Sequence, residues 1–390
     1  MAKGIELVKI NEERAKEVFQ ILDDFWRAKR GVFSDVVLPQ DAWPTPNIWQ
    51  TGFKDDRDKA NWLFYVALPM RGGVVSEVPF RLWWNLKIKR PELFDPNSAS
   101  DFEAREIEKF LRNAIIENFK GDASKLKSMR ENGQPFGFGV SEHSKSWVHN
   151  SGILKKFWDG NILNVFSGVG DFEEAFARID YKQVQVGRKK GIMGMRRKIF
   201  SLLTIWLQEK GLIPVFPTPI PFDFHAQKIS WATEMIEETT CIRRFSSVNG
   251  KYPKYLEGKD CIIVTESFMD VLAVWSQKFM QKNGFSHLVI NPALWILGRR
   301  LCKKNFQNKT WKDATIYIGD KLKKNPHLWP KNYKNPCDFC PLEHLCNWSI
   351  PSGPYYNKWT LLVRGSRRVS PPSQKLPFPG WKEQYPFNSK

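Results

Sequence analysis

Three cysteines lie close together near the C-terminal end of the chain, in the stretch NPCDFCPLEHLC. Cys337, Cys340 and Cys346 have the spacing Cys-x2-Cys-x5-Cys, and the whole chain of 390 residues contains only six cysteines. Short loops can bring three such thiols to one point, which is typical of a zinc ion or an iron-sulfur cluster. Because cysteines this sparse do not form a disulfide scaffold, we interpret the group as a metal site.

The fourth ligand of such a site depends on the metal. His344 lies between the thiols and would complete a Cys3His set for zinc. A [4Fe-4S] cluster takes a fourth cysteine, and Cys302 ends the apolar stretch LWILGRRLC, for which we expect a helix.

A second group of residues suited to chemistry is a basic run ahead of an apolar helical pattern. Between residues 182 and 198 there is no acid and there are seven basic residues, namely Lys182, Arg188, Lys189, Lys190, Arg196, Arg197 and Lys198. Ile199, Leu202, Leu203 and Trp206 follow at helical spacing, so we expect Lys198 to begin a helix packed on the core. Cations at a helix N-terminus bind phosphate, and the alternative is a solvated basic face.

The charge of the whole chain favours a polyanionic partner. Sixty Lys and Arg against 41 Asp and Glu leave a net charge of +19, although some basic proteins bind no polyanion. The chain starts without an apolar signal segment and has no long uncharged apolar run. We therefore expect a soluble monomer that binds nucleic acid, either in the cytoplasm with the nucleoid or in the nucleus, and that contacts no membrane.

Hydrophobic periodicity predicts a mainly α-helical protein. The strongest patterns cover 11–30, with Ala15, Val18, Phe19, Leu22 and Trp26 on one face, and 103–119. The stretch DCIIVTE from Asp260 to Glu266 fits a strand or a buried helix equally well. We predict an N-terminal helix and connection (1–59), a helical core (60–240), a C-terminal helical part with the cysteine loop (241–350) and a basic Pro-rich tail (351–390).

The cysteine region resembles that of the helix-hairpin-helix DNA glycosylases related to endonuclease III and the adenine-mismatch glycosylase. Their cluster loop reads Cys-x6-Cys-x2-Cys-x5-Cys and follows a helix that ends like LILHGR-x-x-Cys. Here the last three cysteines match and LWILGRRLC resembles the helix end, but 34 residues replace six after Cys302. The resemblance implies a structural [4Fe-4S] cluster, with zinc as the alternative, and Cys241 or Cys261 as alternatives to Cys302.

The resemblance extends to a hairpin and an acid. The family has a hairpin like L-P-G-V-G-R-K-T-A followed by V-D-T-H, and this chain has GIMGMRRKIF, opening the segment 191–207, and then PFDFH at 221–225. Gly194 and Lys198 match hairpin positions, and Asp223 and His225 match the acid motif. Arg196 stands where the family has its second hairpin glycine, so a close approach of the backbone to phosphate is not assured there.

This resemblance implies a two-lobed helical glycosylase with an iron-sulfur loop, acting in base excision repair on double-stranded DNA. Asp223 would stabilise the cationic sugar formed when the N-glycosidic bond breaks, and Lys198 would form a Schiff base that permits strand cleavage. A flipped base also leaves a gap in the duplex, which Met70 or Arg71 in ALPMRGG would fill. The alternative for that loop is a plain turn that ends a helix.

Two other functions remain open from the sequence. One is an N-glycosidase acting on a modified nucleoside or on RNA, and the other is a DNA-binding protein that has the hairpin and the cluster but no catalytic activity. Asp223 also precedes a helical pattern and fits the N-cap of that helix, and His225 fits a structural hydrogen-bonding role.

Overall fold

The computed structural model describes residues 8–42, 44, 46–70, 76–118, 139–180, 191–239, 242–244, 260–264, 266–300, 340–346, 349–356 and 359–364. These residues are mainly helical, as the periodicity predicts. The chain divides into two compact units: unit 1 contains residues 1–36 and 222–390, and unit 2 contains residues 37–221.

Unit 1 joins the N-terminal segment to the C-terminal half of the chain. Its described helices are α1 (Glu12–Arg27), the 3-10 helix η1 (Gly31–Phe33), α13 (Phe224–Ala232), α14 (Glu266–Asn283), α15 (His287–Arg300) and the 3-10 helix η10 (Glu343–Leu345). The predicted apolar face of α1 is buried and packs on α15, and Phe19 also contacts Phe279 of α14, with ring centroids 5.6 Å apart. The strand β1 (Val8–Ile10) pairs antiparallel with β2 (Ile236–Thr239). These contacts explain why residues 1–36 belong with residues 222–390. The sequence had instead suggested that residues 1–59 form one segment.

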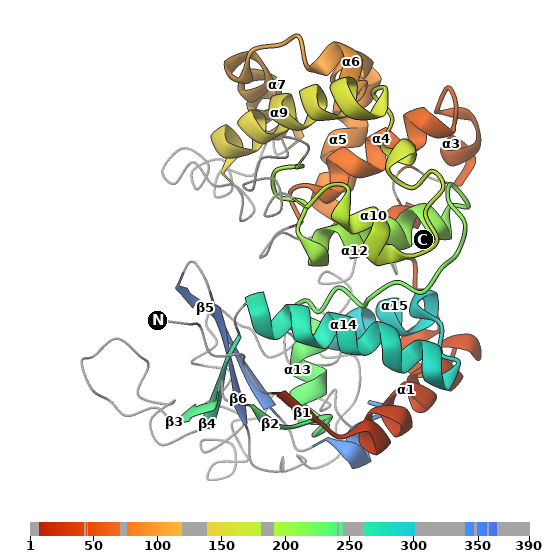
Figure 1. Cartoon of the computed structure of the whole chain (residues 1–390), viewed down its shortest axis with the longest axis vertical. Helices are drawn as coiled ribbons and strands as arrows, with labels where there is room; N and C mark the ends of the chain where they lie inside the picture. Colours follow the sequence, from red (N-terminus) through yellow and green to blue (C-terminus); the bar gives the residue numbers. More distant parts are fainter. Residues whose placement is uncertain are drawn as a thin grey trace, which may run out of the picture. The chain divides into compact units, whose positions relative to one another are not determined.

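Unit 1 also contains an antiparallel sheet of four strands. The order is β3 (Ile242–Arg244), β4 (Asp260–Val264), β6 (Trp359–Arg364) and β5 (Ser349–Tyr356), and α13 lies against β5 and β6 (Figure 1). The ambiguous stretch DCIIVTE is therefore a strand over most of its length. Residues 351–356 and 359–364 belong to strands, which corrects their prediction as part of a basic tail. Pro351 and Pro354 lie in β5, an edge strand of the described sheet, where a missing N–H group is tolerated.

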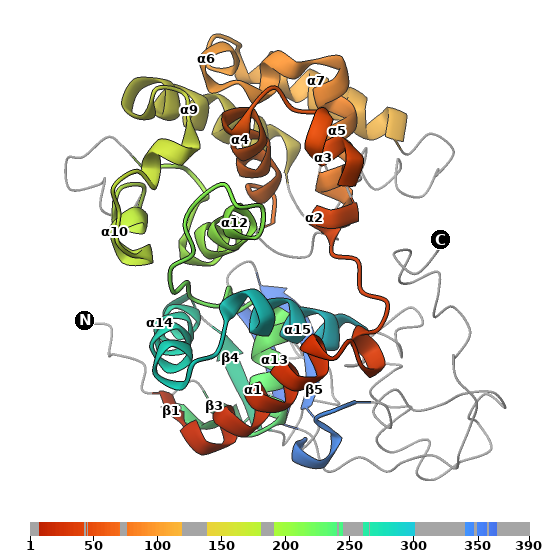
Figure 2. The same ribbon diagram turned by 90° about the vertical axis from the view of Figure 1, so that its right-hand side faces the viewer.

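Unit 2 is built from helices alone in its described part, and Figure 2 shows them from the side. They are α2 (Pro39–Ala42), α3 (Pro46–Thr51), α4 (Asp56–Ala67), α5 (Glu77–Lys89), α6 (Pro96–Ala99), α7 (Ala104–Asn118), α9 (Val140–Trp158), α10 (Phe172–Ala177) and α12 (Arg197–Glu209), with 3-10 helices η2 (Pro91–Phe94) and η4 (Ile162–Val165). Their apolar residues form one core, with α4 at its centre: residues 60–68 are almost wholly buried. A helix buried on all sides shows little amphipathic periodicity, and its sequence NWLFYVAL fits that position.

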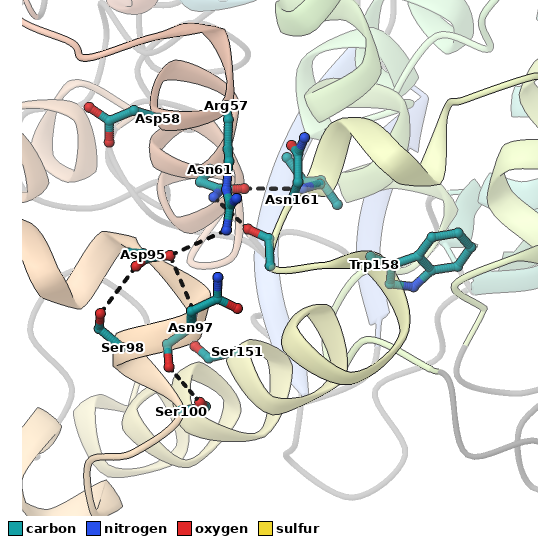
Figure 3. A network of polar contacts seen from close by, with 12 residues as sticks. Arg57, Asp58, Asn61, Asp95, Asn97, Ser98, Ser100, Ser151, Trp158 and Asn161 are labelled. Carbon is teal, nitrogen blue, oxygen red and sulfur yellow. Dashed lines mark hydrogen bonds and ion pairs between the residues drawn. The ribbon is translucent and has the colours of Figure 1, made fainter.

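The C-terminal end of α9 is fixed to α4 and α6 by a polar corner (Figure 3). Gly160 has φ +62°, and its carbonyl accepts a hydrogen bond from Asn61 Nδ2 at 2.9 Å, while Asn61 Oδ1 accepts one from the N–H of Ile162 at 3.1 Å. A Cβ atom at Gly160 would lie 2.7 Å from Cγ of Asn97 and 2.8 Å from Nη2 of Arg57. The backbone angle at this corner favours glycine, and a larger residue would require the ends of the Asn97 and Arg57 side chains to move.

Candidate functional site

The segment 191–207 forms a turn followed by a helix. Gly194 has φ +80°, a conformation that favours glycine, and Met195 N–H bonds to the carbonyl of Ile192 at 3.3 Å. The N–H of Ile192 in turn bonds to the carbonyl of Ile179, just after α10, at 3.0 Å. α12 begins at Arg197, directly after this turn, and residues 181–190, between Ile179 and the turn, lie outside the described part.

Two side chains of α9 hold the turn in place. Asn150, which has no exposed surface, donates from Nδ2 to the carbonyl of Met193 at 3.0 Å and accepts at Oδ1 from the N–H of Met193 at 2.7 Å. Its neighbour His149 lies with Nε2 3.4 Å from the carbonyl oxygen of Gly191. Neither residue could be identified from the sequence, because only the folded chain brings α9 beside residues 191–194.

Arg197 links α12 to α10. Its guanidinium forms a two-pronged ion pair with Glu173, in which Nη2 lies 2.9 Å from Oε2, and it lies 4.9 Å from the ring centroid of Phe176. The side chain of Arg197 is only 16% exposed. It has a structural role that the sequence did not reveal, and Arg196, one residue earlier, is the exposed cation of the turn.

The other basic residues predicted to contact DNA are only partly covered by the structure. Lys198 lies in the first turn of α12 and is half-buried, and Gly194 lies in the turn. Lys182, Arg188, Lys189 and Lys190 lie outside the described residues. Lys198 belongs to unit 2 and Asp223 to unit 1.

Asp223 is the N-cap of α13. Its Oδ1 accepts hydrogen bonds from the N–H groups of His225 at 2.8 Å and Ala226 at 2.9 Å, and the carboxylate is half-buried. The expectation of a capping role is confirmed. Both capping bonds use Oδ1, so capping does not require Oδ2.

α13 packs closely on α15 where the sequence reads LWILGRRLC. A Cβ atom at Gly298 would lie 3.1 Å from Cα of His225, so only glycine fits there without a shift of the helices. The carbonyl of Gly298 accepts a hydrogen bond at 2.7 Å from Nζ of Lys228, a lysine with no exposed surface. His225 and Lys228 thus fix the helix that Asp223 caps.

Met70 does not fit its predicted role. It is 7% exposed and belongs to the core of unit 2. A side chain that fills a gap in DNA has to be accessible, so we correct this assignment: Met70 packs in the core because it ends the buried run of α4. Arg71 lies outside the described residues.

Two of the four proposed cysteine ligands are described. Cys340 and Cys346 are half-buried and stand at the two ends of a tight turn that contains η10. The N–H of Glu343 bonds to the carbonyl of Cys340 at 3.1 Å, and the N–H of Cys346 bonds to the carbonyl of Glu343 at 3.2 Å. Cys302 and Cys337 lie outside the described residues, and in the described part no three His, Cys, Asp or Glu side chains gather as a metal site.

Glu209, a partly buried carboxylate at the end of α12, has a perturbed pKa. Burial raises the pKa of Glu209 to about 7, opposed by the hydrogen bond that Gln40 Nε2 donates to Oε2 at 2.8 Å. Asp41 raises the same pKa further and Lys210 lowers it. Lys210 itself bonds to Asp41 at 2.7 Å and lies 4.6 Å from the ring centroid of Trp49. The contacts of Glu209 and Lys210 with Gln40, Asp41 and Trp49 hold α2 and α3 against the end of α12.

Comparisons of the chain with protein families, with curated proteins and with solved structures gave no match. Among the described helices, none combines the length and the apolar character needed to span a membrane.

Proposed function

We propose that the protein is a DNA glycosylase of the helix-hairpin-helix class that removes a flipped base and cleaves the strand through a lysine Schiff base. The observation that carries the proposal is the order of local structures along the chain. A turn with the left-handed Gly194 precedes α12, Lys198 lies in the first turn of α12, and Asp223 caps the next helix, α13. The net charge of +19 supports a polyanionic substrate.

In this proposal the carboxylate of Asp223 stabilises positive charge on the sugar. The N-glycosidic bond breaks with its electron pair leaving on the base, which takes up a proton, and the sugar becomes cation-like at C1′. The neutral amine of Lys198 then bonds to C1′ and loses one proton. The C1′–O4′ bond breaks next, O4′ takes up a proton, and the nitrogen and C1′ form a protonated Schiff base. Loss of a proton from C2′ then breaks the bond between C3′ and its phosphate oxygen, so the phosphate leaves with the electron pair and the strand is cleaved.

A [4Fe-4S] cluster on Cys302, Cys337, Cys340 and Cys346 belongs to the same proposal. Two observations support it: Cys340 and Cys346 are both half-buried free cysteines, and they stand at the two ends of a turn held by backbone hydrogen bonds. The cluster would supply cross-linking of this loop and no step of the reaction.

The substitution Asp223→Asn tests the chemistry separately from the fold. Asparagine caps helices as well as aspartate does and retains an oxygen for the N–H groups of His225 and Ala226. We expect normal thermal stability, normal duplex binding and loss of base excision. The matched control is Asp171→Asn, because Asp171 caps α10 in the same way, through the N–H of Glu174 at 2.8 Å. Excision that survives Asp223→Asn would refute the proposed role.

Assays with a panel of substrates distinguish the DNA glycosylase from the N-glycosidase and from the non-catalytic DNA-binding protein. Duplexes with oxidised, deaminated or alkylated bases, modified RNA and free modified nucleosides are offered in parallel, and borohydride is added to trap a covalent protein–DNA adduct. Trapping that requires Lys198 supports the lyase step. Release of a base only from RNA or from a nucleoside favours the N-glycosidase, and duplex binding without any release favours the non-catalytic protein.

A further inference from the structure

The outer face of α9 carries a stripe of polar and small residues along its length. Lys145, His149, Gly152 and Lys156 recur at intervals of four, three and four residues, so they share one face of the helix. Lys145, His149 and Lys156 are exposed, and a Cβ atom at Gly152 would meet nothing within 4 Å. This face is accessible in unit 2 and is open at its centre.

The cations of this stripe are not neutralised by carboxylates within the described part of the chain. Neither Lys145 nor Lys156 forms an ion pair there, and Lys156 Nζ lies 5.4 Å from the ring centroid of Phe157. Lys155 differs, because its Nζ bonds to Asp101 at 2.8 Å. Two exposed acids flank the stripe, each three residues from a lysine: Glu142 in the first turn of α9, with its side chain beside Gly139, and Asp159 at the C-cap of α9. The stripe between them presents positive charge.

The stripe adjoins the turn described above. His149 lies in the stripe and contacts the carbonyl of Gly191, and Asn150 binds the backbone of Met193. Exposed Arg196 follows directly after the turn. The turn therefore adjoins the stripe at His149, and the stripe and the residue after the turn together carry three exposed cations, Lys145, Lys156 and Arg196.

We propose that the α9 stripe is a second contact surface for the phosphate backbone of duplex DNA, extending the contact made by the turn. This inference rests on the proposed function only in that duplex DNA is the partner, and it requires no catalysis. Charge complementarity selects this partner, since the DNA backbone carries regularly spaced charges and the stripe spaces its lysines along a helix.

The salt dependence of duplex binding tests the proposal. Each lysine that neutralises a phosphate contributes about 0.9 to the slope of log affinity against log salt concentration for B-form DNA. The double substitution of Lys145→Gln and Lys156→Gln should therefore reduce the slope by roughly 1.8, measured with an undamaged duplex. The matched control is Lys155→Gln, which should leave the slope nearly unchanged because Lys155 is paired with Asp101.

A second pair of variants separates charge from helix stability. Gly152→Ala favours the helix and should leave affinity unchanged, whereas Gly152→Glu places a negative charge in the stripe and should weaken duplex binding. An unchanged slope in the double lysine variant, or an equal change in Lys155→Gln, would overturn this inference alone if excision continues. If the wild-type protein binds no duplex at low salt, both this inference and the proposed function are wrong. If excision survives in Asp223→Asn while the double lysine variant shows the reduced slope, the catalytic role is wrong and this inference is supported.

Discussion

The side chain of Asn150 satisfies both backbone polar groups of Met193, donating to its carbonyl at 3.0 Å and accepting from its N–H at 2.7 Å. A helix in the middle of unit 2 thus determines the conformation of a turn that lies about forty residues later in the chain. Asn150 is itself fully buried, so its amide has no water to bond in place of Met193.

Asn150→Leu should destabilise the protein because it removes both side-chain hydrogen bonds to the backbone of Met193. We expect a loss of about 1–3 kcal/mol in the free energy of unfolding, measured by urea denaturation. Asn164→Ala is the control, since half-buried Asn164 donates one bond, to the carbonyl of Trp158 at 3.0 Å, and its loss should cost about 1 kcal/mol. Equal effects of the two variants would contradict a special role for Asn150.

Gly160→Ala should be far more damaging than Gly168→Ala. Both glycines have similar left-handed angles, with φ +62° and φ +67°, so both variants incur the same backbone strain of about 1–2 kcal/mol. Only at Gly160 does the new Cβ atom meet Asn97 and Arg57, whereas at Gly168 it meets nothing within 4 Å. The difference between the melting temperatures of the two variants measures the destabilisation caused by the contacts with Asn97 and Arg57. Similar melting temperatures would show that these two side chains move aside.

Glu209→Gln should change the way stability depends on pH. The folded pKa of about 7 lies above the ordinary 4.5, so between these values the folded chain binds more protons than the unfolded chain. The free energy of unfolding therefore falls as pH rises through this window. We expect the variant to match the wild type near pH 4.5 and to melt higher at pH 8, because glutamine avoids burial of a charge at either pH. An exposed control, Glu103→Gln, should follow the wild type at both values, and a variant that melts lower at pH 8 would contradict this account.

Anaerobically purified protein should contain about four irons per chain, with matching sulfide and a broad absorption band at about 400 nm. Parallel variants Cys302→Ser, Cys241→Ser and Cys261→Ser should identify the fourth ligand, since only the ligand's loss should bleach the band. One zinc in a colourless protein would instead support the Cys3His site with His344.

The sequence by itself determined the helices whose apolar residues recur regularly. The apolar residues that recur along α1, α7 and α12 are buried or partly buried, because helical spacing depends only on neighbouring residues. The capping of α13 by Asp223 was predictable for the same reason, since an N-cap bond spans two or three residues. The strand β4 stayed ambiguous, because a short apolar run fits a helix or a strand until partner strands are known.

Only the tertiary structure decided which distant segments meet. It grouped the first 36 residues with the C-terminal half, placed residues 349–364 largely in a sheet and buried Met70, which the loop sequence suggested was accessible. It also paired Arg197 with Glu173 while leaving Lys145 and Lys156 of the neighbouring helix without ion-pair partners among the described residues. Such pairings depend on contacts between residues far apart in the chain, which composition and local spacing do not encode.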